Sequence, residues 1–129
     1  MNIKRLLIAL VAGFAFVFAF DMFWHTYLMK DLYIATKQLW RPENPAYLIY
    51  MFVSQFLFVL AVAFFWVKVG TSSSSGFVFG CCLGAVMAAP ALATHSYMPI
   101  PLTISGLWML AGFIKSLGTS LIVSTLYKD

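Results

Sequence analysis

Apolar residues in this chain gather in four long runs that are separated by short polar segments. The runs cover approximately residues 3–28, 46–67, 77–97 and 102–127. A helix needs roughly 20 apolar residues to cross the ~30 Å hydrocarbon core of a bilayer, so each run is long enough to span a membrane once. The pattern therefore predicts an all-α fold, a four-transmembrane-helix bundle that forms a single membrane domain over residues 1–129.

The segments between the runs predict how the helices are joined. Residues 70–76 read Gly-Thr-Ser-Ser-Ser-Ser-Gly, a composition typical of a flexible turn, and residues 98–101 predict a tight turn with two prolines. In the longest connection, residues 29–45, apolar residues recur at helical spacing from Leu28 to Leu39. We expect a short interfacial helix there, lying on the membrane surface and ending before Pro42.

The composition indicates that lipid is the main solvent of this chain. Hydrophobic residues make up 63% of the sequence and charged residues 9%, whereas soluble domains carry about 25% charged residues. The mean hydropathy is +0.93. The net charge of +4 lies mostly at the ends of the apolar runs, where it anchors helices at the headgroups. The expected partners are the lipid bilayer and other membrane subunits or further copies of this chain, and nucleic acid is excluded.

The distribution of basic residues predicts the orientation. One side of the membrane would carry Lys4, Arg5, Lys68 and Lys128, and the other would carry Lys30, Lys37 and Arg41. Because the charges beside the first helix usually dominate, we expect both termini to lie in the cytoplasm. The first run also resembles a signal peptide, but its length favours a helix that is retained.

Small residues recur every four positions on the third and fourth runs. The third run has Gly76, Gly80, Gly84 and Ala88, and the fourth has Gly112, Ser116, Ser120 and Ser124. Such stripes let helix backbones approach closely in a membrane. We expect the two stripes to pack against each other, the alternative being that one of them faces another subunit.

Ionisable residues at membrane depth are expensive and therefore mark candidate sites. Asp21 would lie ~10 Å and Lys115 ~20 Å below the same surface, at 1.5 Å of rise per residue. Side chains lean toward the N-terminus of their helix, so the two side chains reach toward each other. We predict an Asp21–Lys115 ion pair, the alternative being a Lys115 side chain that snorkels to the headgroups.

Two histidines extend the list of candidate sites, because His25 and His95 each lie near the end of a span on the same side. Asp21 and His25 are four residues apart and so share a helix face. Four interpretations remain open. They are structural hydrogen bonds; a copper or zinc site of Asp21, His25 and His95 with help from Met22, Met29 or Met98; a haem between the two histidines; and a proton path with Asp21 as the titrating group.

Motifs of known enzyme classes are missing from the sequence. It has no Gly-rich phosphate loop, nucleophile elbow or His-Glu-x-x-His pattern, and only four acidic residues. We therefore expect no catalysis and no obligatory cofactor. The adjacent Cys81 and Cys82 are expected to be buried and reduced. The favoured function is an accessory or assembly subunit of a larger membrane complex, and the alternatives are a small oligomeric proton- or cation-coupled transporter or channel and a haem- or metal-binding protein.

Several short motifs resemble those of a known group of proteins. They are Asp21-Met22-Phe23-Trp24-His25, Lys30-Asp31-Leu32-Tyr33, Leu39-Trp40-Arg41-Pro42-Glu43, Tyr97-Met98-Pro99-Ile100-Pro101, Trp108 and Leu126-Tyr127-Lys128. Together they resemble a family of small bacterial four-helix integral membrane proteins that share a domain of unknown function. The resemblance covers most of the chain and implies a multi-pass protein of the bacterial inner membrane, and it implies no activity.

Overall fold

The computed structural model describes residues 1–69 and 75–128, and within these ranges the chain is all α. The long helices are α1 (Ile3–Phe23), α3 (Leu48–Val69), α4 (Gly76–Ala93) and α5 (Leu102–Leu126). A π-helical turn, Trp24–Leu28, extends α1, and the short helix α2 (Lys30–Ala35) follows it. Most of the turn predicted at residues 70–76 lies outside the described residues.

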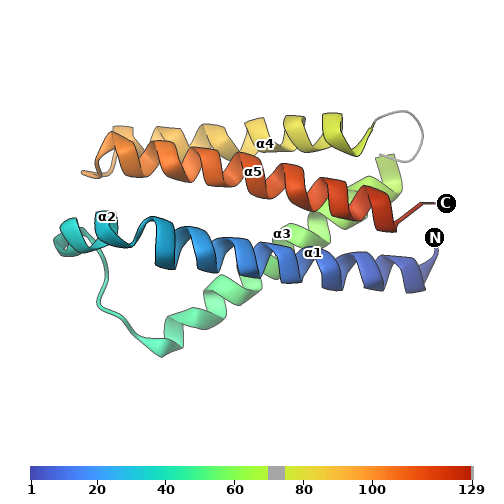
Figure 1. Cartoon of the computed structure of the whole chain (residues 1–129), viewed down its shortest axis with the longest axis horizontal. Coiled ribbons are helices and arrows are strands. Elements are labelled where there is room, and N and C mark those ends of the chain that lie inside the picture. The colour runs from blue at the N-terminus through green and yellow to red at the C-terminus, as the bar shows by residue number, and fades with distance from the viewer. Residues whose placement is uncertain (70–74, 129) are drawn as a thin grey trace.

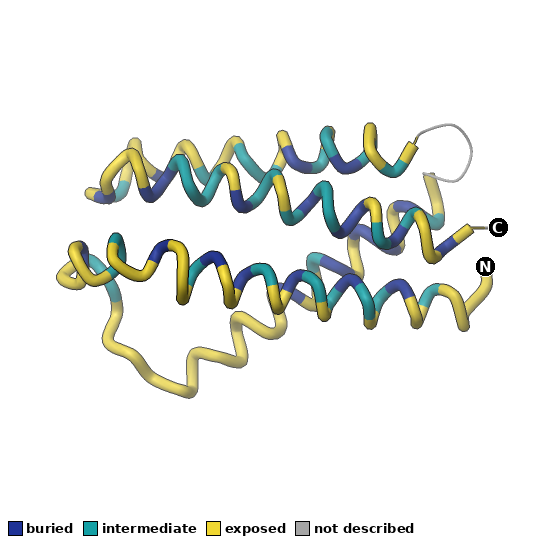
Figure 2. Tube along the Cα trace, in the orientation of Figure 1, coloured by how far each residue is buried: buried dark blue, intermediate teal, exposed yellow. Residues whose placement is uncertain are grey.

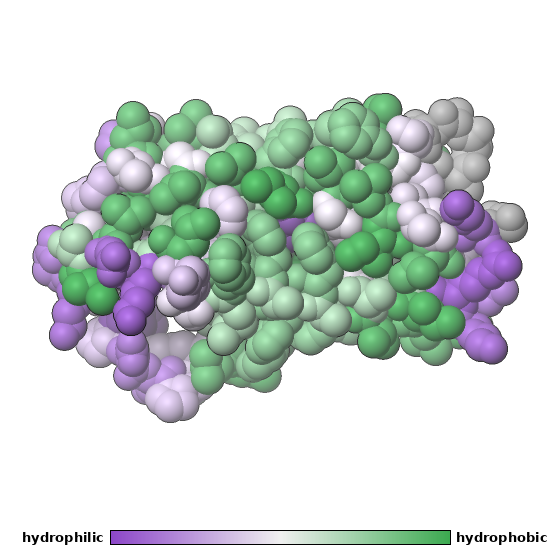
Figure 3. Space-filling model, viewed as in Figure 1, coloured by the Kyte–Doolittle hydropathy of each residue, from purple (hydrophilic) through white to green (hydrophobic). Residues whose placement is uncertain are grey.

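Four stretches of the described chain are long and apolar enough to cross a membrane. They are Ile3–Leu28, Pro45–Val69, Gly76–Ser96 and Leu102–Leu126. The expected all-α architecture, with four such helices and a short helix between the first two, is confirmed at this level. On the face shown in Figure 3, hydrophobic residues form a broad band across the middle, and hydrophilic residues gather toward the two ends.

The helices form an uneven bundle (Figure 1). α4 and α5 lie side by side, α1 runs along α5, and α3 crosses them obliquely. The two termini lie at one end of the bundle, called here the termini end, and α2 lies at the opposite α2 end. The Asn2 backbone N–H donates to the Tyr127 hydroxyl at 3.1 Å, and the Arg5 guanidinium donates to the Lys128 carbonyl. Both termini therefore face the same side of a membrane that the bundle crosses.

Close approach of α4 to α5 depends on the small-residue stripes. A Cβ added to Gly80 would lie 2.9 Å from the Leu117 Cα, and one added to Gly76 would lie 1.9 Å from Ser124 Oγ. At Gly84 the added atom would meet the Phe113 ring at 2.7 Å. The stripe on α4 thus faces α5 within one chain. Lipid offers no hydrophobic drive for helix association, so this contact is stabilised mainly by dispersion between closely packed backbones.

Two apolar clusters fill the interior, one toward each end of the bundle. The cluster at the termini end contains Ala9, Val62, Ala63, Trp66, Val123 and Tyr127. The cluster at the α2 end contains Trp24, Met29, Ile100, Ile104 and Ala111. Leu32 and Leu39 pack against this second cluster, so the apolar side of the first connection is directed at least in part toward the protein itself.

The first half of α3 leaves the bundle. Every residue from position 41 to position 54 is exposed, whereas Gln55, Val59 and the later residues of the inner face of α3 are buried. Figure 2 shows this exposed segment extending away from the other helices. Before Gln55, α3 keeps an aromatic contact with α1, in which the Phe52 and Phe18 rings stack with their centroids 5.5 Å apart.

The cysteines correct one expectation. Cys82 is exposed and Cys81 is half-buried, so the expectation that both are buried is wrong. Gly80 and Gly84 point at α5, and position 82 lies on the opposite side of the same helix. The Cys82 side chain lines an apolar groove between α3 and α4 instead of the interior.

Candidate functional site

An ion pair joins α1 to α5 inside the membrane-spanning part of the bundle. Lys115 Nζ lies 3.1 Å from Asp21 Oδ2 and 3.2 Å from Oδ1. Gln55 on α3 donates its Nε2–H to Asp21 Oδ2 at 3.0 Å. The Asp21 carboxylate is thus held by side chains from two other helices, which compensates for the removal of its charge from water.

Helix periodicity explains why Asp21 points inward. Ala9, Gly13, Val17 and Asp21 follow one another every four residues, and all four are buried. Lys115 precedes the buried Ser116 on α5, and its long side chain retains 20% exposure. The ammonium group also lies 5.8 Å from the centre of the Phe58 ring, a favourable cation–π distance.

A polar cavity of about 220 Å³ surrounds the ion pair. The polar side chains in its wall are Asp21, His25, Ser54, Gln55 and Lys115. Gln55 Oε1 is buried and has no hydrogen-bond partner among the described residues. A water occupies about 30 Å³ of liquid, so the cavity has room for several waters.

A chain of hydrogen bonds leads from this cavity to the α2 end. His25 Nδ1 lies 2.7 Å from the Tyr33 hydroxyl, and Trp108 Nε1 donates to the same hydroxyl at 2.7 Å. The Tyr33 oxygen also lies 3.5 Å from the Met29 sulfur. The π-helical turn, α2 and α5 therefore meet at one phenol group, with His25 between that group and the ion pair.

Tyr33 lies outside the membrane-spanning segments, and its environment stabilises the neutral phenol. Burial raises the pKa of the Tyr33 hydroxyl above its ordinary value of 10.0; the hydrogen bond from Trp108 opposes this rise and the nearby Asp21 charge adds to it. The hydroxyl therefore keeps its proton at neutral pH and can both donate and accept a hydrogen bond.

We expect the stability contributed by Tyr33 to be lost in alkali. The folded-state pKa is higher than that of the unfolded chain, so this contribution is complete below about pH 10 and falls as the pH rises through the folded-state pKa. Chemical unfolding in detergent from about pH 8 to about pH 11 should show a steeper loss for wild type than for Tyr33→Phe. Tyr97→Phe, at an exposed tyrosine, should keep the wild-type slope. Equal slopes for wild type and Tyr33→Phe would contradict the prediction.

His95 has a different local role from His25. Its Nδ1 lies 2.8 Å from the Ile100 carbonyl oxygen, across the turn between α4 and α5. His95 is exposed. Within residues 1–69 and 75–128, no three His, Cys, Asp or Glu side chains gather closely enough to hold a metal ion. Asp21, His25 and His95 therefore do not form the three-ligand site considered from the sequence.

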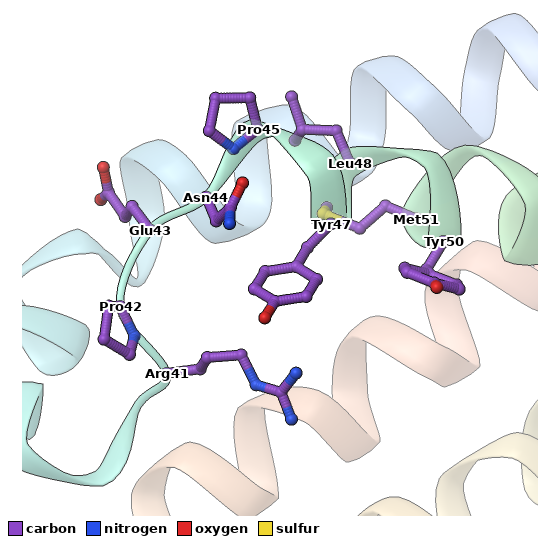
Figure 4. Close-up of a pocket in the computed structure, with 9 residues that line it drawn as sticks. All are labelled: Arg41, Pro42, Glu43, Asn44, Pro45, Tyr47, Leu48, Tyr50 and Met51. Atoms are coloured by element: carbon purple, nitrogen blue, oxygen red, sulfur yellow. The ribbon is translucent and has the colours of Figure 1, made fainter.

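Two further cavities lie at the α2 end. One, of about 590 Å³, contains Arg41, whose guanidinium carbon lies 4.8 Å from the centre of the Tyr47 ring. Figure 4 shows the guanidinium extended beneath Tyr47 and the Glu43 carboxylate directed away. The other, of about 950 Å³, is lined by Tyr33, Lys37, Arg41 and Glu43 among others.

Sequence reasoning overlooked Gln55, Tyr33 and Trp108 as parts of this site. Gln55 carried a usable signal, because an amide inside an apolar run needs a partner. Tyr33 and Trp108 carried no such signal, because aromatic residues near a membrane surface are normally explained by their preference for the lipid headgroup region. Neither family models, nor curated proteins, nor solved structures show a match to this chain.

Proposed function

We propose that this chain is a non-catalytic accessory or assembly subunit that packs, through the open side of its polar cavity, against another integral membrane protein. The observation that carries the proposal is an ion pair at membrane depth that the chain itself does not fully cover. The side chains of Lys115 and Asp21 retain 20% and 9% exposure. Met51 and Ser54 in the cavity wall belong to the exposed half of α3.

Lipid is a poor cover for such a cavity. Acyl chains offer no hydrogen bonds to a charged ammonium group such as that of Lys115. A transmembrane helix of another subunit, seated beside the exposed half of α3, can supply both a polar group for the Lys115 ammonium and an apolar surface. The missing enzyme motifs support a role in assembly over one in catalysis.

The basic residues support an orientation for this subunit. With the termini end in the cytoplasm, the charges of Lys4 and Arg5 lie on the side that favours positive charge. The α2 end then faces the outside of the cell. The motif resemblance supports the bacterial inner membrane as its location.

Purification from native membranes in a mild detergent, followed by native mass spectrometry, tests the proposal. We expect stoichiometric foreign subunits in the wild-type sample. Ser54→Phe, which fills the cavity mouth, should release them, whereas Val86→Phe on the exposed side of α4 should retain them. A stable monomer or a homo-oligomer without foreign chains would overturn the proposal.

A second candidate, a small proton- or cation-coupled transporter or channel, is favoured by the cavity itself. It places a carboxylate, an ammonium group and an imidazole around a space of about 220 Å³ inside the membrane. Proton or cation flux into liposomes that contain the purified protein, abolished by Asp21→Asn, would support transport. Flux that survives this substitution would exclude the Asp21 mechanism.

A haem or metal bound by His25 and His95 gains no support from the geometry. Among the described residues, no three His, Cys, Asp or Glu side chains gather closely enough to hold a metal ion. We therefore do not propose this function.

A further inference from the structure

The Tyr33–His25 pair connects two separate cavities. Tyr33 lines the large cavity at the α2 end, together with charged residues of the first connection. His25 lines the small cavity that contains Asp21 and Lys115. The hydroxyl and the imidazole are 2.7 Å apart, so a hydrogen bond links a residue in the wall of the outer cavity to one in the wall of the inner cavity.

The donors and acceptors on this line suit proton transfer. Trp108 Nε1 can only donate, so it occupies one lone pair of the Tyr33 oxygen. The phenol proton then has two acceptors, and His25 Nδ1 at 2.7 Å is closer and stronger than the Met29 sulfur at 3.5 Å. His25 Nδ1 accepts that proton in one tautomer, which places the other ring proton on Nε2. Asp21 and His25 both lie in the wall of the inner cavity, which has room for water.

The same site is closed toward the termini end. On the buried face of α1, the next residues in that direction are Val17, Gly13 and Ala9. On α5, Ser116, Thr119 and Ser120 are fully buried, so their hydroxyls lie away from water. Val59 of α3 fills the remaining side, its Cγ1 lying 2.8 Å from where a Gly13 Cβ would be.

We propose that Tyr33 and His25 form a proton relay through which Asp21 exchanges protons with the aqueous phase at the α2 end and not with that at the termini end. A hydronium ion in the outer cavity gives a proton to the Tyr33 oxygen and is left as water, as the phenol passes its own proton to His25 Nδ1. His25 then releases its Nε2 proton to a water in the inner cavity, and that water protonates Asp21. His25 is left as the other neutral tautomer, which ring rotation or reverse transfer resets.

The charged and titratable groups around the relay are few. Asp21 faces Lys115 from α5 and His25 from its own helix, while α3 contributes the neutral Gln55 and α4 only Met87. Tyr33 shares the outer cavity with Lys37, Arg41 and Glu43. Protonation of Asp21 removes the partner charge of Lys115, so proton uptake weakens the link between α1 and α5. This inference does not depend on a partner subunit.

Infrared spectroscopy of proteoliposomes tests the sidedness. The protonated-carboxyl band of Asp21 is isolated as the difference between wild type and Asp21→Asn, and protease removal of a C-terminal tag measures the fraction of molecules with the α2 end outward. With the pH inside the liposomes held constant, acidifying the outside should increase the intensity of this band only in the molecules whose α2 end faces outward. A response from molecules with the termini end outward, or no titration of Asp21 at all, would overturn the relay.

The rate of band appearance after a pH jump tests the two relay residues. Tyr33→Phe should slow it about a hundredfold, the size of effect expected when a positioned proton-transfer group is lost. His25→Gln should do the same, and it serves as the second test if loss of the Trp108 acceptor unfolds Tyr33→Phe. Tyr97→Phe, at an exposed tyrosine near the same end, should keep the wild-type rate. Unchanged rates in both relay variants would refute the proposal even if the partner subunit is found.

Discussion

Lys115→Met is expected to lower the free energy of unfolding by about 3 kcal/mol, the low end of what is measured when one member of a buried ion pair is removed. The substitution leaves the Asp21 carboxylate with Gln55 as its remaining side-chain donor. It also leaves the charge at membrane depth without the ammonium group that compensates it. Equilibrium unfolding in detergent micelles, with helix content followed by circular dichroism, measures this loss.

The double variant Asp21→Asn/Lys115→Met is the matched control. The introduced asparagine side chain carries no charge, and its carbonyl oxygen can still accept the Gln55 Nε2–H that Asp21 accepts at 3.0 Å. Most of the lost stability should therefore return, because neutral replacements of a buried pair are often tolerated. A neutral effect of Lys115→Met alone would show that the pair contributes nothing and that Lys115 interacts with headgroups or a partner.

Gly80→Ala is expected to destabilise the protein by about 2 kcal/mol, the usual cost of overpacking a closely packed contact. The new methyl group would lie 2.9 Å from the Leu117 Cα, and a backbone atom cannot move aside without shifting α5. The same unfolding measurement reports the change. Increased separation of α4 from α5 can be followed by a spin-label pair at the exposed positions Val86 and Leu110.

Gly106→Ala, in the same pair of helices, is expected to change the stability in the opposite direction. A Cβ at Gly106 meets no described atom within 4 Å. Alanine is the better helix former by about 1 kcal/mol in helix interiors, so this variant should be as stable as wild type or more stable. Equal destabilisation by the two alanines would contradict the close contact at Gly80.

The polar site divides into a part that sequence reasoning reached and a part that it did not. From the sequence, the membrane depth and side-chain direction of the two residues predicted an Asp21–Lys115 pair. In the structure Lys115 Nζ lies 3.1 Å from Asp21 Oδ2. The hydrogen-bond partner of His25, Tyr33, could not be predicted in this way. Tyr33 lies in a connection whose path depends on how α2 folds back against the cluster around Trp24, and no periodicity encodes that path.

The sequence alone determined the number of long apolar helices and the residues by which α4 could approach α5. Insertion into lipid depends on the summed transfer free energy of each segment, which is a local property of composition, and small residues mark a close contact wherever it occurs. Only the tertiary structure decided that α3 leaves the bundle before Gln55, and that Tyr33 connects an outer cavity to the ion pair. Those features depend on the crossing angle and rotation of whole helices, which are set by many weak contacts between distant residues and by no single segment.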